Sequence, residues 1–267
     1  MCEQQNGIVI GGNITRLFCH VCTSVIIFFA INIPCPGTVF VSEKAQLKAV
    51  TVIENYPYSF VDKGVIQGLG IDVMTILADR AGFELSIEAQ PATRALISAK
   101  TLASVLVLNL AKTPEREPLY YWIGPVSSSD VWLYKFKSRR DVQVRSMEDV
   151  KHYLVGVAIS DATIPVLQQY GIRFDVAPSD LSNCRKFKIG RFELITVNPK
   201  AIREFLSACG IEADQVEQLI KFPLDNSIYF GLSKHTPIEV VNKLNTEMEG
   251  MKKDQTLYKI NSKWKIY

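Results

Sequence analysis

The segment with the clearest chemical potential is residues 111–117, which read AKTPERE. It follows an apolar run, 103–110, that predicts a buried strand. Thr113 can cap a short helical turn, and Pro114 suits the first position of that turn because it has no N–H group to leave unsatisfied. Arg116 is then expected to project from a strand end, where its guanidinium could bind a carboxylate through two hydrogen bonds. Taken alone, the segment fits a plain surface turn equally well.

Composition narrows the class of protein. The chain has 267 residues, of which 48% are hydrophobic and 21% charged, as expected for one large globular domain or two smaller lobes. The net charge is +3 and the basic residues are scattered, which argues against a nucleic-acid partner. His152 and His235 stand alone without the spacing of a metal site, and we expect neither a metal nor a cofactor.

The N-terminal part has a different composition from the rest. Residues 17–33 are nearly all apolar, follow Arg16, and precede the helix-breaking Pro34 and Pro36. This order predicts a secretory signal peptide, and hence a periplasmic protein. A retained membrane anchor stays open, because about 17 apolar residues are just enough to span a bilayer. We assign residues 1–45 to this N-terminal segment.

Export bears on the cysteines. Four of the six lie before residue 36, which leaves Cys184 and Cys209 in the exported part. In an oxidising compartment these two could form a disulfide. The sequence does not say whether their Cα atoms come within bridging distance.

From residue 47 onward, strand-like and helix-like segments alternate. The capping pattern at 236–239 begins a long amphipathic helix near the C-terminus. This alternation, run twice, predicts a two-lobed α/β protein. We expect strands over 49–53, 84–88, 103–110, 120–123, 131–137, 154–159, 174–177, 192–197 and 227–232, and helices over 71–81, 91–100, 146–153, 161–171, 179–189 and 198–210.

Several short segments together resemble a known family, the type II periplasmic solute-binding proteins of the polar amino-acid class (bacterial extracellular solute-binding protein family 3). The resemblance covers nearly everything from 51 to 264. Each piece is weak alone, but their order and spacing support one family. They are ENYPYSF at 54–60, GLGID at 68–72, TPER at 113–116, VGV at 155–157, GRFEL at 190–194, and YKI at 258–260 before Trp264.

This resemblance implies a type II fold, in which two lobes joined by two hinge strands close on a ligand. Lobe one would comprise 46–129 plus 229–267, and lobe two 130–228. The function it implies is extracytoplasmic capture of a small carboxylate-bearing solute, an amino acid or a relative, for a membrane permease of the ABC class. We expect such a protein to be a monomer.

The resemblance also implies a set of ligand-binding residues. Arg116 takes the place of the arginine that binds the ligand's α-carboxylate. Helix-start N–H groups in lobe two would also favour an anion. The other positions are Asn109 and Ala111 on the preceding strand, Tyr56 and Tyr58 as covering aromatics, and Ser160, Asp161 and Thr163 at that helix start.

Asn198 departs from the family pattern. The family's acidic partner for the α-ammonium group falls at this position, and an amide supports an ammonium less well than a carboxylate does. Asn198 also precedes Pro199 in a favourable helix start, so a ligand role and a capping role both stay open. Asp161 could supply the missing charge or be a cap itself. Arg94 could face the cleft or the wet side of its helix.

Two other functions remain. If 17–33 is retained, the lobes would form a ligand-sensing module at the membrane. A lyase on the same fold would need a general acid or base in the cleft. No histidine falls at an expected ligand position, and only Asp161 and Glu54 are plausible carboxylates. We therefore expect a binding protein and no enzyme.

Overall fold

The computed structural model describes residues 44–266. The apolar run 17–33, and with it the predicted signal peptide or anchor, lies outside these residues. Within residues 44–266, no helix is both long enough and apolar enough to cross a membrane.

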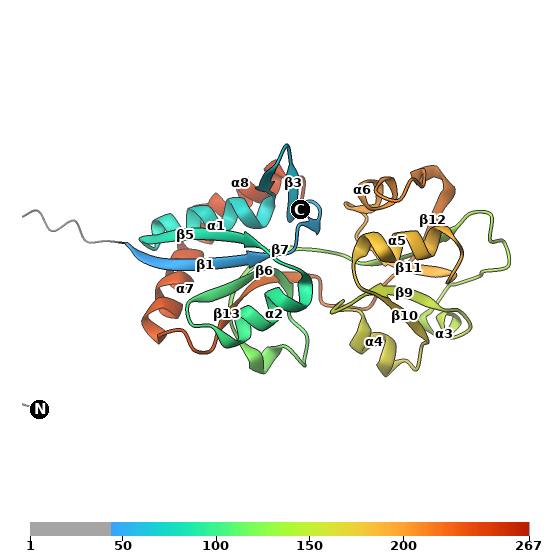
Figure 1. Cartoon of the computed structure of the whole chain (residues 1–267), viewed down its shortest axis with the longest axis horizontal. Helices are drawn as coiled ribbons and strands as arrows, with labels where there is room; N and C mark the ends of the chain where they lie inside the picture. The colour runs from blue at the N-terminus through green and yellow to red at the C-terminus, as the bar shows by residue number, and fades with distance from the viewer. Residues whose placement is uncertain (1–43, 267) are drawn as a thin grey trace, which may run out of the picture. The chain divides into compact units, whose positions relative to one another are not determined.

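The first sheet has five strands and mixed direction (Figure 1). Strand β1 pairs in parallel with β5 and β6, whereas β13 runs antiparallel to both β6 and β7. A late segment of the chain, β13, therefore returns to the interior of the sheet, between β6 and β7. The order is β5 (Phe83–Ala89), β1 (Ala45–Thr51), β6 (Val105–Ala111), β13 (Ser227–Ser233) and β7 (Tyr120–Ser128).

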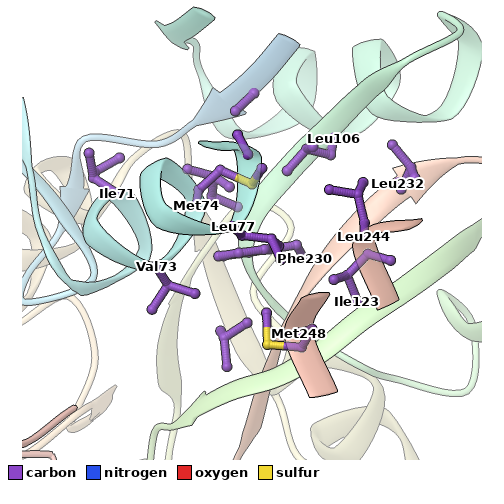
Figure 2. Close-up of a cluster of buried hydrophobic side chains, with 14 of the residues drawn as sticks. Ile71, Val73, Met74, Leu77, Leu106, Ile123, Phe230, Leu232, Leu244 and Met248 are labelled. Carbon is purple, nitrogen blue, oxygen red and sulfur yellow. The ribbon is translucent and has the colours of Figure 1, made fainter. Parts of the chain in front are cut away.

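Helices cover both faces of this sheet. Helices α1 (Leu69–Arg80), α7 (Ile238–Lys253) and α8 (Thr256–Lys263) share one apolar cluster with it, part of which Figure 2 shows. There Leu77 of α1 and Leu244 of α7 pack on Phe230 of β13, all three fully buried. Helix α2 (Ala92–Thr101) packs on the opposite face through Ala95 and Ala99. We call this sheet with its helices lobe one.

A small three-stranded sheet, β2–β3–β4, is inserted between β1 and α1. It carries the aromatic residues of the 54–60 segment. Its strands are β2 (Glu54–Asn55), β3 (Ser59–Asp62) and β4 (Val65–Gln67).

The second large sheet also has five strands, and it builds lobe two. Apolar clusters lie on both of its faces, one with α3 (Met147–Val150) and α4 (Ile164–Gln169), the other with α5 (Asp180–Lys188) and α6 (Ile202–Ser207). The order is β10 (Phe174–Ala177), β9 (Val155–Ala158), β11 (Leu194–Val197), β8 (Trp132–Phe136) and β12 (Val216–Lys221).

The chain crosses between the large sheets twice, from β7 to β8 and from β12 to β13. Asp130 in the first crossing accepts a hydrogen bond of 2.8 Å from Asn226 in the second, and it pairs with Lys221 at 2.8 Å. The two crossings are thus tied to each other. The residue boundaries expected for the lobes, 46–129 plus 229–267 and 130–228, stay a prediction.

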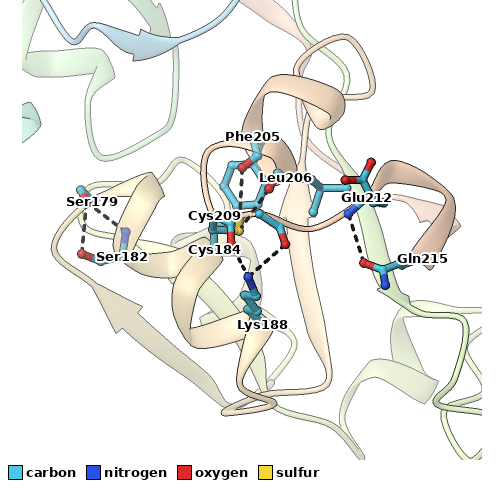
Figure 3. The surroundings of a disulfide bond; sticks show 10 residues. Ser179, Ser182, Cys184, Lys188, Phe205, Leu206, Cys209, Glu212 and Gln215 are labelled. Atoms are coloured by element: carbon cyan, nitrogen blue, oxygen red, sulfur yellow. Dashed lines mark hydrogen bonds between the residues drawn. A yellow bond between two sulfur atoms is a disulfide. The ribbon is translucent and has the colours of Figure 1, made fainter.

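Cys184 and Cys209 form a disulfide, which confirms the pairing that the sequence left open. Their Cα atoms are 6.0 Å apart, and the bond links α5 to the chain just after α6 (Figure 3). The ammonium group of Lys188 donates to the backbone carbonyls of Cys209 and Gly210 beside it, at 2.9 and 3.0 Å. The bond therefore fixes the two helices on one face of the second sheet.

Two local expectations were wrong, and one strand was missed. Thr113 uses its backbone carbonyl, not its side chain, to accept the N–H groups of Arg116 and Glu117, and a 3₁₀ helix follows at Glu117–Leu119. No capping box forms at 236–239, because the hydroxyl of Thr236 accepts the N–H of Ser104 instead. Strand β12 was not predicted, since its sequence VEQLIK lacks a clean alternation.

Candidate ligand-binding cleft

Two adjoining cavities lie among the loops that follow the strands of lobes one and two. Their volumes are about 610 and 590 Å³, sizes that suit a small organic ligand. Both are lined by Glu54 from β2 and by Asp161 and Asp180 from lobe two. We call the two cavities together the cleft.

Arg116 lies in the turn after β6 and lines the larger cavity. Its guanidinium donates to the carbonyl of Ala111 at 3.2 Å and to the carbonyl of Ser160 in lobe two at 2.5 Å. Burial lowers the pKa of Arg116, and the negative charge of Asp161 partly offsets that effect. The group stays cationic at neutral pH and is placed to attract an anion in the cleft.

The strand before Arg116 contributes mainly backbone. Ala111 lines the cavity and its carbonyl holds Arg116. Asn109 also lines it, with a left-handed φ of 57°, but its side chain turns to other partners. Its amide donates to Ser59 at 3.2 Å, and a Cβ on Gly70 would lie 2.0 Å from its Oδ1. The Asn109 side chain therefore packs on the start of α1.

The two tyrosines have separate surroundings. Tyr56 lines the smaller cavity, with its ring 5.0 Å from that of Phe60. Tyr58 is 1% exposed and lines neither cavity, and its hydroxyl donates to the carbonyl of Ser128. Burial raises the pKa of Tyr58. Of the two tyrosines, Tyr56 alone lines the cleft.

Asn198 lines the smaller cavity, but its side chain is engaged elsewhere. Its amide donates to the hydroxyl of Ser129 at 2.7 Å and to that of Tyr58 at 3.5 Å, so it connects lobe two to the crossing after β7. Its carbonyl oxygen accepts the N–H of Lys200 at 2.8 Å. Helix α6 begins only at Ile202, so Asn198 closes a turn instead of capping a helix.

The loop between β9 and α4 brings a carboxylate to the cleft. Ser160 has a left-handed φ of 63°, and its carbonyl accepts from Arg116. The carboxylate of Asp161 accepts the N–H and the hydroxyl of Thr163, both at 2.9 Å. Burial raises the pKa of Asp161, although these bonds and Arg116 oppose the shift. The N–H group of Thr163, which was expected to favour an anionic ligand, thus already donates to Asp161. The Thr163 side chain is fully buried.

Sequence reasoning missed Asp180. It is the first residue of α5, just after the capping Ser179, and it lines both cavities. Burial, together with the negative charges of Asp161 and Glu54, raises its pKa to about 7. Its place after strand 174–177 was a signal, because ligand-binding groups gather at the carboxyl ends of parallel strands.

Three expected residues, Tyr58, Thr163 and Arg94, line neither cavity. Arg94 is exposed on α2, whereas its neighbours Ala95 and Leu96 line the larger cavity. The cleft does bring together Arg116, Ala111, Asn109, Tyr56, Ser160, Asp161 and Asn198. Within residues 44–266, no group of three or more His, Cys, Asp or Glu side chains is arranged to hold a metal ion.

Two curated relatives have low sequence identity to this chain, but the matches extend over most of both chains. The L-cystine-binding protein of Bacillus subtilis (strain 168) is 21% identical over 226 residues, which cover 84% of this chain and 82% of that protein. The arginine-binding extracellular protein of the same organism is 20% identical over 240 residues, 84% of this chain and 87% of that protein.

Solved structures share the fold. An ancestral arginine-binding protein bound to arginine matches with a TM-score of 0.70 at 19% identity, over 83% of this chain and 98% of that one. A histidine kinase sensor domain with similarity to periplasmic binding proteins matches with a TM-score of 0.72 at 12% identity, over 83% and 96%. The two-lobed type II fold expected from the sequence is confirmed.

The model of the bacterial extracellular solute-binding proteins, family 3, matches residues 47–266, nearly all of the described chain. This match confirms the resemblance that the sequence segments indicated. The chain belongs to the bacterial extracellular solute-binding proteins of family 3.

Proposed function

We propose that this protein captures a small carboxylate-bearing solute, an amino acid or a relative, outside the cytoplasm and delivers it to a membrane permease of the ABC class. The observation that carries the proposal is the guanidinium of Arg116 at the wall of the larger cavity. In an environment that excludes water, such a group binds a carboxylate more strongly than it would at the surface.

The names of the relatives support a ligand of this class, since both curated relatives are named for amino acids that they bind. The closure mechanism would follow from the hydrogen bond between Arg116 and Ser160, which already joins the lobes. A ligand carboxylate that takes the place of the Ser160 carbonyl would offer the Arg116 guanidinium a negatively charged acceptor instead of a neutral one. Closure would then be driven by the higher affinity of the ligand for the closed form.

A thermal-shift screen of the purified protein tests the proposal. Carried-over ligand is removed by partial unfolding and dialysis, and the panel contains amino acids, di- and tricarboxylates and short peptides. A ligand at a hundred times its Kd adds about 2.7 kcal/mol, or roughly 5–11 °C in Tm. A panel without any stabilising carboxylate would contradict the proposal.

A matched pair of variants then tests the anchor. Arg116→Ala should weaken binding of the best ligand at least about 30-fold in calorimetry, because it removes one partner of a buried charge pair. Arg94→Ala removes an exposed arginine that lines neither cavity and should leave the affinity unchanged. Wild-type affinity in Arg116→Ala would show that the carboxylate binds elsewhere.

A second candidate, a lyase that uses the same cleft, is favoured by Asp180, whose pKa of about 7 would suit a general acid or base at neutral pH. Incubation of the protein with each stabilising ligand, followed by proton NMR of the ligand, separates the two functions. An unchanged ligand supports the binding protein, whereas a new product spectrum that is lost in Asp180→Asn supports the enzyme.

A further inference from the structure

The charge of the cleft is one-sided. Of the described residues that line its two cavities, Arg116 is the only positively charged side chain. Five lining residues are carboxylates: Glu54, Asp161, Asp180, Glu204 and Asp225. A plain dicarboxylate or a neutral solute would leave most of this negative charge without a partner.

Two of the five cleft carboxylates are not exposed, Asp161 and Asp180, and of these Asp161 accepts two hydrogen bonds from Thr163 whereas Asp180 accepts none from the described residues. None of the described residues donates a hydrogen bond or forms an ion pair with its side chain, and only like charges act on it electrostatically. Figure 3 shows the start of α5, where Ser179 is occupied with Ser182 and does not serve Asp180. A desolvated carboxylate without a partner is costly to the fold, and such a cost is typical of a group kept for a ligand.

An independent sign that a polar ligand belongs here is Thr196 on β11. This residue is 8% exposed and lines the smaller cavity together with Asp161 and Asp180, and its hydroxyl has no hydrogen-bond partner. Buried hydroxyls are nearly always satisfied. An unsatisfied hydroxyl that lines the same cavity as the unpartnered carboxylate of Asp180 indicates that hydrogen-bonding groups are missing from this end of the cleft.

Asn198 does not fill that gap. Its amide and carbonyl are used by Ser129, Tyr58 and Lys200, and an amide carries no charge. The α-ammonium group of an amino acid would therefore move to the acidic end of the cleft, near Asp161 and Glu54. One ammonium compensates one carboxylate, which leaves Asp180 for a second cation.

We propose that the ligand is an amino acid with a cationic side chain, and that Asp180 receives this second cation at the acidic end formed with Glu54 and Asp161. The proposal rests on the proposed function, because Arg116 must hold the ligand's carboxylate while Asp180 binds the cationic group of the same ligand. The ligand would then carry a net positive charge, and Asp180 would be a specificity-determining residue.

The same charges would couple cation binding to closure. Glu54 belongs to lobe one, whereas Asp161 and Asp180 belong to lobe two, so like charges face each other where the lobes meet. A cation placed between them turns this repulsion into attraction. A neutral amino acid would leave the repulsion in place, and the closed form would select against it.

Titration calorimetry on the stripped full-length protein tests the inference with matched probes. L-arginine is compared with L-citrulline, which replaces the guanidinium by a neutral ureido group of nearly the same shape, and L-lysine with L-norleucine. At least one cationic probe should bind about tenfold or more tightly than its neutral partner. Asp180→Asn should shrink that ratio to within about threefold.

Asp225→Asn provides the control. Asp225 also lines the larger cavity, but it is exposed, and its carboxylate accepts the N–H of Ser227, a bond that an amide oxygen can keep. This variant makes the same charge change at the rim and should retain the wild-type ratio. An equal loss in both variants would reduce the effect to general electrostatics and overturn the role of Asp180.

Proton release gives a second readout. A cation at Asp180 should ionise it, so L-arginine binding at pH 7 should release about half a proton, and Asp180→Asn should release fewer. Calorimetry in two buffers of different ionisation enthalpy measures this number. Unchanged release in a folded Asp180→Asn variant would overturn the assignment.

The outcomes separate the two proposals. Citrulline binding as tightly as arginine, and norleucine as tightly as lysine, would overturn the inference and leave the carboxylate anchor intact. Agmatine is arginine without its carboxylate. If agmatine binds as tightly as arginine, the role of Arg116 as the carboxylate anchor is overturned, whereas the role of the acidic end in binding a cation stands. Failure of all amino acids to bind would overturn the inference, and failure of every carboxylate in the panel would overturn both proposals.

Discussion

The guanidinium of Arg116 and the backbone carbonyl of Ser160 meet between the two lobes in a hydrogen bond of 2.5 Å. Ser160 adopts a left-handed backbone conformation there, with φ 63°. A residue with a Cβ is strained in that region, so the strain is located where one lobe touches the other. The loop after β9 thus combines an unusual backbone conformation with a hydrogen bond to the proposed anchor, Arg116.

Substitutions at Ser160 test this strain. Ser160→Gly should change the free energy of unfolding by no more than about 0.5 kcal/mol, because relief in the folded state offsets the added freedom of the unfolded chain. Ser160→Val should destabilise the protein by about 1–2 kcal/mol, since a β-branched residue tolerates positive φ poorly. Urea unfolding followed by circular dichroism measures both. Equal stability of the two variants would contradict the strain.

Asn198 is expected to serve stability instead of binding. Asn198→Ala removes the bonds to Ser129 and Lys200 and should lower the free energy of unfolding by about 1–2 kcal/mol. Ligand affinity should change by less than about threefold. Chemical unfolding and calorimetry on the same preparation check the two parts. A large loss of affinity at unchanged stability would instead return Asn198 to the ligand set.

The disulfide should stabilise the protein substantially. It joins residues 25 apart in sequence, and loop-closure entropy for that length gives about 3.5 kcal/mol. The double variant Cys184→Ala/Cys209→Ala should therefore unfold at a clearly lower urea concentration than the wild type. A thiol reductant should lower the wild-type midpoint and leave that of the variant unchanged. Identical wild-type midpoints with and without reductant would show that the bond contributes little.

Stability should depend on pH through Asp180. Its pKa in the folded protein, about 7, lies above the ordinary value of 3.8, so the folded protein binds a proton that the unfolded chain has already released between these values. Stability should fall as the pH rises from about 4 to about 7, by at most about 1.4 kcal/mol per pH unit for one group. The other charged residues that line the cleft are Glu54, Asp161, Glu204, Asp225 and Arg116.

Asp180→Asn should reduce this slope, and Asp161, whose pKa burial also raises, should supply part of the remainder. Asp225→Asn, at the exposed rim, should keep the wild-type slope. Urea unfolding at pH 4.5, 6 and 7.5 gives the three slopes. A wild-type stability that rises across this range would show that Asp180 is ionised without cost.

Local signals in the sequence were enough to predict the fold class and to propose Arg116 as the anchor. Alternating apolar segments with helix caps such as Ser179 are local signals, and each is decided by a few neighbouring residues. Arg116 could be identified because strand, turn and arginine follow one another directly. The possible pair of Cys184 and Cys209 could likewise be named, although their distance could not.

Which charged side chains line the cleft together depends on the packing of distant segments. Glu54, Asp161 and Asp180 are far apart in sequence, and the raised pKa of Asp180 depends on burial and on the other two carboxylates. The same holds for Asn198, whose partners Ser129 and Tyr58 come from distant segments, and for Thr236, whose hydroxyl serves Ser104 instead of its own helix. Desolvation and long-range pairing are properties of the packed chain, so no local pattern could have shown them.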